Sequence, residues 1–401
     1  MPPKLTVTIA GGGIGGLTLA IMLSAANIDY VVLERSSGLR TMGSTIALNA
    51  CSLRLMEQLG LWPEIQKIAK PIGAFHLQND DLSPIGTIDF TFGEKHYGYH
   101  GYVMSRPELF KLLMSYVPKS KILLQKAVVD VAETDFGVLC RCSDGSEYWS
   151  DMVVGADGAY SKVRERMYHG LQMEGRLPLE DAEPLKLTHL CVLGVSTPLD
   201  PKVFSTVEQR FSEFELVLMR KRSLSIWLSP IGGNKISWCY GGEIEPGSHN
   251  LMEGLDGYWG KGSTNTLQIL EEINDVPTVY GSCHKVLPFA GQGAVHAMLD
   301  GLCLVNLLHE MKGTTTTDFE RVFQTYYQQR SGAARKAVIG SRIFGRFVAS
   351  RGTFAHWVRE IVLKFFPKWF TRMLADLVMR DRPQLSFLPR IEDRGMVKAL
   401  Y

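Results

Sequence analysis

The strongest constraint on this chain is a glycine pattern near its N-terminus. Gly11, Gly13 and Gly16 form a G-x-G-x-x-G sequence between an apolar, strand-like run (Leu5–Ala10) and a helix-like run (Leu17–Ala26). In such a turn the first glycine permits a tight bend, the second lets the backbone approach a pyrophosphate, and the third lets helix and strand pack closely. The amides at the start of the helix favour phosphate.

A second apolar run, Tyr30–Leu33, ends in Glu34, eighteen residues after Gly16. An acid at this position of the second strand can accept hydrogen bonds from a ribose hydroxyl. Strand, glycine turn, helix and acid together predict a βαβ unit that binds a dinucleotide.

The same region contains no charged residue between Leu5 and Ile28, and it is long enough to cross a bilayer. The glycine cluster and the matching second strand favour a buried parallel strand and helix instead. There is also no A-x-A-like cleavage site of the kind that ends a signal peptide. We therefore expect neither a membrane span nor a secretory signal in this region.

Composition limits the class of protein. A chain of 401 residues allows two domains, or one domain with a large insertion. The formal net charge of +2 gives no reason to expect a nucleic-acid partner. Seven cysteines are scattered without C-x-x-C or zinc spacing, which predicts reduced thiols, a cytoplasmic location and no metal site.

Two later motifs complete a resemblance to a known family. The first is VVGADGAYSKVRERM, which contains Asp157 and Gly158, and the second is HKVLPFAGQGAVHAMLDG, which begins at His284. With the N-terminal βαβ unit, in this order, they are specific. The chain resembles the FAD-dependent aromatic-hydroxylase type of flavoprotein monooxygenase (class A flavoproteins), in particular fungal members that epoxidise or hydroxylate lipophilic natural products.

The resemblance implies an FAD site built from these motifs and from residues near them. Its expected cofactor contacts are Gly11, Gly13, Gly16, Glu34, Arg35, Gly43, Arg106, Asp157, Gly158, Pro288, Gly291, Gln292, Gly293 and Ala294. Arg106 matches the arginine that reaches FAD in this family, although an exposed arginine at a helix start is the simpler alternative. Residues Gly291–Ala294 open a helix whose amides can stabilise negative charge on the reduced flavin ring. No catalytic acid or base is identifiable.

We expect an α/β fold: a Rossmann-like FAD-binding domain with an inserted, mostly antiparallel substrate sheet and a helical C-terminus. Strand-like runs without intervening helices mark the substrate sheet between residues 188 and 242. The expected division is 1–185 and 276–345 for the FAD-binding domain, 186–275 for the substrate sheet, and 346–401 for the helical C-terminus.

The resemblance implies an NAD(P)H-consuming monooxygenase with NADPH as electron donor, O2 as co-substrate and a lipophilic small molecule as substrate. The substrate would lie between the flavin and the substrate sheet, where Trp227, Trp238 and Tyr240 line an apolar pocket or simply pack within the sheet. A flavin-dependent reductase is the alternative with different chemistry.

One motif departs from the family pattern. Where the family has Gly-Asp, this chain has Gly281 followed by Ser282, and the connection that leads to His284 is short. The run Val279–Gly281 could serve as a stub of the strand that presents this motif. A second hypothesis follows, namely a catalytically impaired relative that binds FAD weakly.

The C-terminal region combines basic and aromatic residues. Between Arg342 and Leu374 there are seven Lys or Arg, eight Phe or Trp, and a single acid, Glu360. The apolar residues Ile361, Phe365, Trp369 and Met373 recur every four positions beside the basic residues Lys364, Lys368 and Arg372. This pattern suits an interfacial helix, so we expect peripheral membrane contact, with packing on the FAD-binding domain as the alternative.

Overall fold

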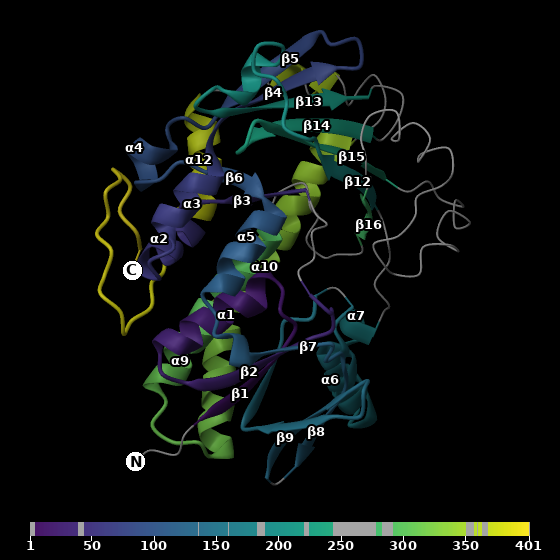
Figure 1. Cartoon of the computed structure of the whole chain (residues 1–401), viewed down its shortest axis with the longest axis vertical. Helices are drawn as coiled ribbons and strands as arrows, with labels where there is room; N and C mark the ends of the chain where they lie inside the picture. Colours follow the sequence, from purple (N-terminus) through teal and green to yellow (C-terminus); the bar gives the residue numbers. More distant parts are fainter. Residues whose placement is uncertain are drawn as a thin grey trace, which may run out of the picture.

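The computed structural model describes residues 5–400 except 39–43, 135, 159, 183–188, 220–223, 244–277, 283–291, 350–356, 359 and 363–367. Within these ranges the chain forms a four-stranded parallel sheet, a small antiparallel sheet and a nine-stranded sheet. Long helices connect the parallel sheet at one end of the molecule with the nine-stranded sheet at the other (Figure 1). The expected α/β fold with a separate antiparallel sheet is confirmed.

The parallel sheet contains the predicted βαβ unit. Its strands, in spatial order, are β11 (Met152–Gly155), β1 (Thr6–Ala10), β2 (Asp29–Glu34) and β7 (Ile122–Leu124). Helix α1 (Ile14–Ala25) connects β1 to β2. Val7, Ile9 and Val32 are almost completely buried, as expected where both faces of a parallel sheet are covered.

The small antiparallel sheet consists of three strands that follow one another in the chain. Its strands are β8 (Val128–Thr134), β9 (Gly137–Cys142) and β10 (Glu147–Ser150). Cys140 and Cys142 stand two residues apart on β9 and are both buried. Burial raises the pKa of the Cys140 thiol to about 12, so these are inert core thiols.

The nine-stranded sheet joins two distant parts of the chain. In spatial order its strands are β16 (Thr278–Ser282), β12 (His189–Val195), β15 (Lys235–Glu243), β14 (Leu224–Ile231), β13 (Ser212–Leu218), β4 (Ala69–Asn79), β6 (Tyr102–Ser105) and β3 (Thr45–Leu48), with β5 (Pro84–Asp89) beside β4. The antiparallel substrate strands are confirmed. They continue into β4 through a parallel pairing with β13, which local patterns could not reveal.

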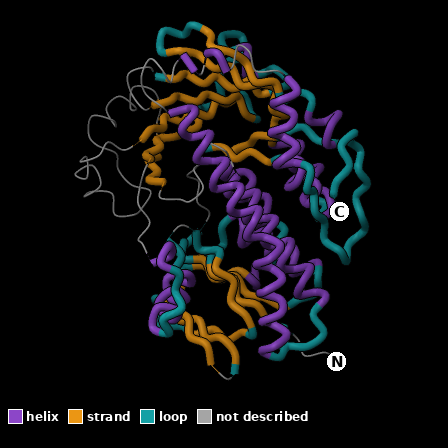
Figure 2. The backbone as a smooth tube through the Cα atoms, turned by 180° about the vertical axis from the view of Figure 1, so that it is seen from behind, coloured by secondary structure: helices purple, strands orange, loops and turns teal. Residues whose placement is uncertain are grey.

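The helices cover and connect the sheets. They are α2 (Ala50–Gln58), α3 (Trp62–Ile68), α4 (Gly93–Tyr97), α5 (Arg106–Ser115), α6 (Lys162–Met173), α7 (Leu179–Ala182), α9 (Gln292–Glu310), α10 (Thr316–Ala349) and α12 (Lys368–Met379), with short 3-10 turns at Lys119–Lys121 and Ser205–Val207. Helix α10 has 34 residues and runs from the side of α9 to the nine-stranded sheet (Figure 2). Among the described residues, no helix is both long and apolar enough to cross a bilayer.

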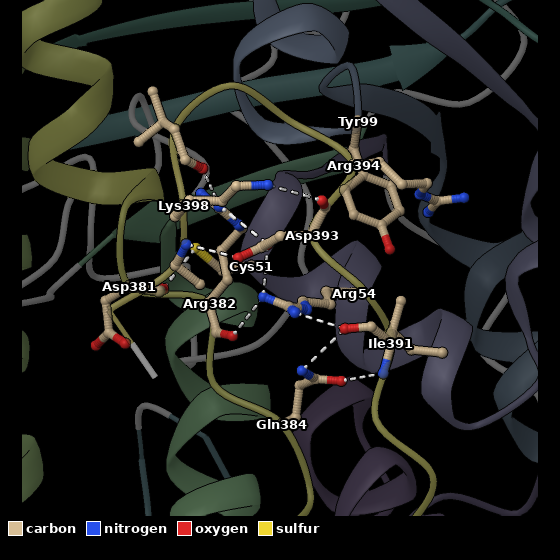
Figure 3. A network of polar contacts seen from close by, with 12 residues as sticks. Cys51, Arg54, Tyr99, Asp381, Arg382, Gln384, Ile391, Asp393, Arg394 and Lys398 are labelled. Carbon is tan, nitrogen blue, oxygen red and sulfur yellow. Dashed lines mark hydrogen bonds and ion pairs between the residues drawn. The ribbon is translucent and has the colours of Figure 1, made fainter.

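The C-terminus is helical only in part. Helix α12 ends at Met379, and residues 380–400 form neither helix nor strand, so the expected helical C-terminus is wrong for this segment. Buried polar contacts hold the segment instead (Figure 3). Asp393 lies 2.9 Å from Nη1 of Arg54 on α2 and 3.2 Å from Nη2 of Arg382, and these two arginine side chains are 2% and 0% exposed.

The shared carboxylate of Asp393 makes this segment sensitive to pH. Burial disfavours the charged form of Asp393, but the amide of Ala399 and the guanidinium groups of Arg382 and Arg54 outweigh it and lower the pKa of this carboxyl. A lowered pKa stabilises the fold fully above the pKa of an unfolded aspartate, about 3.9, and this contribution disappears as the pH falls through the folded value.

We predict that Asp393→Asn lowers the free energy of unfolding at neutral pH by about 2–4 kcal/mol, because it leaves two buried guanidinium groups without their carboxylate. Denaturant unfolding at pH 7 and at pH 3 measures this, and the difference between variant and wild type should shrink at the lower pH. Asp130→Asn is the matched control, since Asp130 also pairs with two arginines but at the surface; it should cost less than about 1 kcal/mol. Equal losses for both variants would contradict the prediction.

Candidate cofactor site

The glycine turn has the geometry that its sequence predicts. Gly11 has φ +107°, and a Cβ atom there would lie 2.4 Å from the carbonyl oxygen of Ala156 at the end of β11. A Cβ on Gly16 would lie 2.0 Å from the carbonyl oxygen of Gly11. At Gly13, by contrast, a Cβ would meet no atom of the described residues within 4 Å. Two glycines are therefore required for packing, while Gly13 faces open space where a pyrophosphate can approach.

Glu34 is fixed at the end of β2 against this turn. Its Oε2 accepts a hydrogen bond from the amide of Gly12 at 2.7 Å, and its Oε1 accepts one from the amide of Ser36 at 2.9 Å. Each carboxylate oxygen can accept a second hydrogen bond, as from a ribose hydroxyl. Glu34 therefore fixes the conformation of the glycine turn through these two amides, and the ribose contact remains a prediction.

Asp157 stands at the end of β11, beside Gly11. Its Oδ2 accepts hydrogen bonds from the amides of Lys162 at 2.7 Å and Val163 at 3.3 Å, at the start of α6. Its Oδ1 is buried and accepts no hydrogen bond within the described part of the chain. A buried acceptor without a donor is costly in a native protein unless a ligand supplies the donor, so this atom fits a cofactor hydroxyl. Gly158 follows with φ +84°, which explains the glycine.

Helices α1 and α9 bring two helix N-termini to the same end of the site. A Cβ on Gly15 would lie 3.1 Å from Cβ of Ala297, and a Cβ on Gly301 would lie 2.8 Å from Cε of Met22. Residue numbers rise together along both helices, so the helices are parallel. No described side chain caps α1, whose first amides therefore remain available to an anion. Two positive helix ends facing one region favour a ligand with phosphates or a reduced flavin ring.

A buried ion pair fixes the first turns of α9 to α10. Nε of Arg330 donates to Oδ1 of Asp300 at 2.6 Å, and its Nη2 lies 3.3 Å from Nδ1 of His296. Burial lowers the pKa of His296 and the charge of Arg330 lowers it further, against the opposing effect of Asp300. His296 is therefore neutral at neutral pH and accepts from the guanidinium group, which anchors the helix.

Arg106 begins α5, and its backbone ties the cofactor region to the substrate sheet. Its amide donates to the carbonyl oxygen of Ser44 at 2.9 Å. The buried hydroxyl of Ser44 in turn hydrogen-bonds the hydroxyl of Ser237 on β15. Ser105 occupies the predicted N-cap position but makes no side-chain capping hydrogen bond. Arg35 follows Glu34 directly at the end of β2.

The three aromatic residues expected to line one pocket lie on opposite faces of the sheet. Trp227 pairs with Cys239 across β14 and β15, so both face the side on which Phe344 of α10 packs. Trp238 and Tyr240 flank Cys239 in the strand and therefore point to the other side, where they pack with Val192. The expectation of a single pocket is wrong, because strand register separates these side chains.

The structure brings most of the predicted cofactor residues together. The glycine turn, Glu34, Asp157 and Gly158 meet at the ends of β1, β2 and β11, and Gln292, Gly293 and Ala294 form the first turn of α9 beside α1. Gly43, Pro288 and Gly291 lie outside the described residues. Gly15 and Gly301 were not anticipated; their positions inside helices were the signal that could have revealed the close helix contact.

Comparisons with known proteins agree with this geometry. The FAD binding domain family matches residues 4–190. The FAD-dependent monooxygenase atmM of Aspergillus flavus is 25% identical over 96% of this chain and 87% of its own length. The FAD-dependent monooxygenase nvfK of Aspergillus novofumigatus is 33% identical, over 49% of this chain and 43% of its own length.

Solved structures share the whole fold. A structure of Klebsiella pneumoniae HpxO with FAD and uric acid superposes with a TM-score of 0.73 at 16% identity, covering 94% of this chain and 98% of that one. A salicylate hydroxylase substrate complex gives a TM-score of 0.65 at 17% identity, covering 96% and 99%.

Residues 4–190 match an FAD-binding domain, so the N-terminal part of the chain is identified as a domain that binds FAD. The chain as a whole is similar to fungal FAD-dependent monooxygenases, and it shares its fold with a salicylate hydroxylase. The open approach at Gly13, the unpartnered Oδ1 of Asp157 and the two helix N-termini fit this cofactor.

We predict that Gly13→Ala and Gly16→Ala separate cofactor binding from folding. Alanine at Gly13 should weaken FAD binding at least about tenfold by obstructing the pyrophosphate, with unchanged stability of the FAD-free protein. Alanine at Gly16 should lower that stability by about 1–3 kcal/mol, because the added methyl group overlaps the carbonyl of Gly11. Flavin fluorescence titration and thermal unfolding without FAD measure the two effects. A stability loss at Gly13 with unaltered FAD affinity would contradict the assignment.

Proposed function

We propose that the enzyme uses NADPH and O2 to hydroxylate or epoxidise a lipophilic small molecule. When bound, FAD supplies electron transfer from NADPH and the activation of O2. The residues of this chain orient the cofactor, stabilise negative charge at the N-terminus of α9 and exclude water. The similarity to fungal FAD-dependent monooxygenases supports the reaction type, and the substrate class and the donor NADPH are our proposal.

The observation that carries the substrate class is an uncharged strip of the nine-stranded sheet. On the side that faces α10, the paired positions are Ser225 with Gly241, Trp227 with Cys239, and Ser229 with Ser237. None of these side chains carries a charge at neutral pH, and a hydrogen bond with Cys191, together with burial, raises the pKa of Cys239 well above its usual value. Ser237 also contacts Ser44, which adjoins the cofactor region. A substrate between the flavin and this strip would meet an apolar surface with a few hydroxyl groups.

We expect NADPH oxidation by the FAD-loaded enzyme to rise with at least one member of a terpenoid and aromatic panel. Trp227→Ala should then raise KM for that compound about tenfold, because it removes the largest side chain of the strip. Leu228→Ala is the control, since Leu228 is the next residue of β14 and points to the opposite face. A rate of NADPH oxidation that no compound of the panel increases would count against the proposal. Equal KM values for Trp227→Ala and Leu228→Ala would do so as well. Turnover under strict anaerobiosis would indicate the alternative, a flavin-dependent reductase.

A second candidate is an impaired relative that binds FAD weakly. It is favoured by Ser282, which stands where the family has aspartate. In the described part of the chain, β16 pairs with β12 at the edge of the nine-stranded sheet and does not join the parallel sheet of the βαβ unit. This placement is consistent with a shortened motif.

We predict that Ser282→Asp tightens FAD binding about tenfold, because it restores a charged hydrogen-bond acceptor. The FAD dissociation constants of both proteins are the measurement, with Ser282→Asn as the uncharged control. No gain with aspartate would mean that the junction is complete as it stands.

We also propose a cytoplasmic enzyme with peripheral membrane contact, which would bring the active site to a lipophilic substrate. The basic and aromatic composition of residues 342–374 supports this contact.

A further inference from the structure

Two polar side chains at one edge of helix α12 contact the rest of the protein. Asp376 accepts a hydrogen bond from the Tyr97 hydroxyl at 2.6 Å, and the guanidinium group of Arg372 lies 5.8 Å from the ring centre of Phe92. Both contacts are made with α4 and its flanking residue, beside which α12 lies in Figure 1. Ala375 and Met379, on the same side of the helix, pack against the core of the FAD-binding region.

The outward side of α12 is apolar. Its exposed side chains are Trp369 (63%), Met373 (41%), Leu374 (45%), Leu377 (75%) and Val378 (43%). At 100° per residue these positions cover about half of the helix circumference, with Ala375 and Met379 on the opposite half and Asp376 at the edge beside Trp369. A surface helix of a globular protein normally has the reverse arrangement, with the apolar side buried. A contiguous exposed apolar face of this kind marks an interaction surface.

The charged residues around this apolar face indicate what kind of surface it binds. Asp376, at the edge of this face, accepts the hydrogen bond from Tyr97, and none of the five exposed side chains is acidic. Arg372 is exposed on the helix beside the face, and Arg380 is exposed just after the helix ends. The sequence from 342 to 374 adds a strong excess of basic residues over one acid. An apolar face that contains tryptophan and is bordered by cations fits the headgroup region of an anionic bilayer.

We infer that the outward face of α12 docks on the surface of a lipid bilayer that contains anionic lipids. This inference rests on the proposed peripheral membrane contact and names the surface that makes it. Trp369, Met373, Leu374, Leu377 and Val378 enter the acyl boundary, while Arg372 and Arg380 meet the lipid phosphates. Docking leaves α12 bound to α4 through Tyr97 and Asp376, so it requires no rearrangement of the fold.

Vesicle flotation of the FAD-loaded protein, without NADPH or substrate, tests the docking surface. Wild type should float with vesicles of phosphatidylcholine and phosphatidylserine, and less with phosphatidylcholine alone. Leu377→Glu should reduce the partition coefficient at least about tenfold, because it places a charge in the apolar face. Val203→Glu is the matched control, since Val203 is 71% exposed but lies before β13, far from α12 in the sequence; it should float as wild type does.

Three results would overturn the inference. In the first, the wild-type protein stays in the fraction without vesicles. In the second, the Leu377→Glu variant floats as well as the Val203→Glu variant. In the third, sedimentation without lipid shows that the wild-type protein is a dimer and the Leu377→Glu variant a monomer. The last would assign the face to a second copy of this chain. Because flotation is scored on yellow protein without turnover, failure here leaves the proposed oxygenation intact, and failure of oxygenation leaves a positive flotation result intact.

Discussion

The close parallel contact between α1 and α9 is the constraint on which the cofactor site depends. Gly15 meets Ala297 and Gly301 meets Met22, so the two backbones approach more closely than larger side chains would allow. Because the helices run in the same direction, the positive ends of both dipoles lie together. One end belongs to the glycine turn and the other to a segment nearly 300 residues further along the chain. The pairing of these helices thus assembles a site that neither segment contains alone.

The register of the nine-stranded sheet decides which side chains lie on each of its faces. Residues that alternate along β15 face opposite sides, so Cys239 faces α10 while Trp238 and Tyr240 do not. A shift of one residue would exchange these faces and put a different set of side chains toward the cofactor. The hydroxyl contact between Ser44 and Ser237 couples this register to the cofactor region. The chemical character of the sheet face toward α10 therefore follows from strand pairing rather than from composition.

The C-terminal part of the chain packs on the FAD-binding region through two elements, the irregular segment after Met379 and helix α12. Residues after Met379 place Asp393 between Arg54 and Arg382, and this buried charge network makes an irregular segment part of the FAD-binding region. Such a network is stable only while every charge keeps its partner. Helix α12 precedes this segment. It contacts α4 through Asp376 and Tyr97, and its apolar side chains face solvent. The same packing of α12 therefore attaches the helix to the protein and leaves its apolar face exposed.

The sequence by itself determined the βαβ unit, the positions of Glu34 and Asp157, the start of helix α9 and the antiparallel strands between residues 188 and 242. These features depend on local backbone requirements and on short-range periodicity, which leave marks in adjacent residues. Only the tertiary structure decided that β4 joins β13, that Trp227 is separated from Trp238, and that residues 380–400 are held by buried charges without forming a helix. Each of these depends on pairing between residues more than a hundred positions apart or on strand register, and neither is encoded in a local pattern.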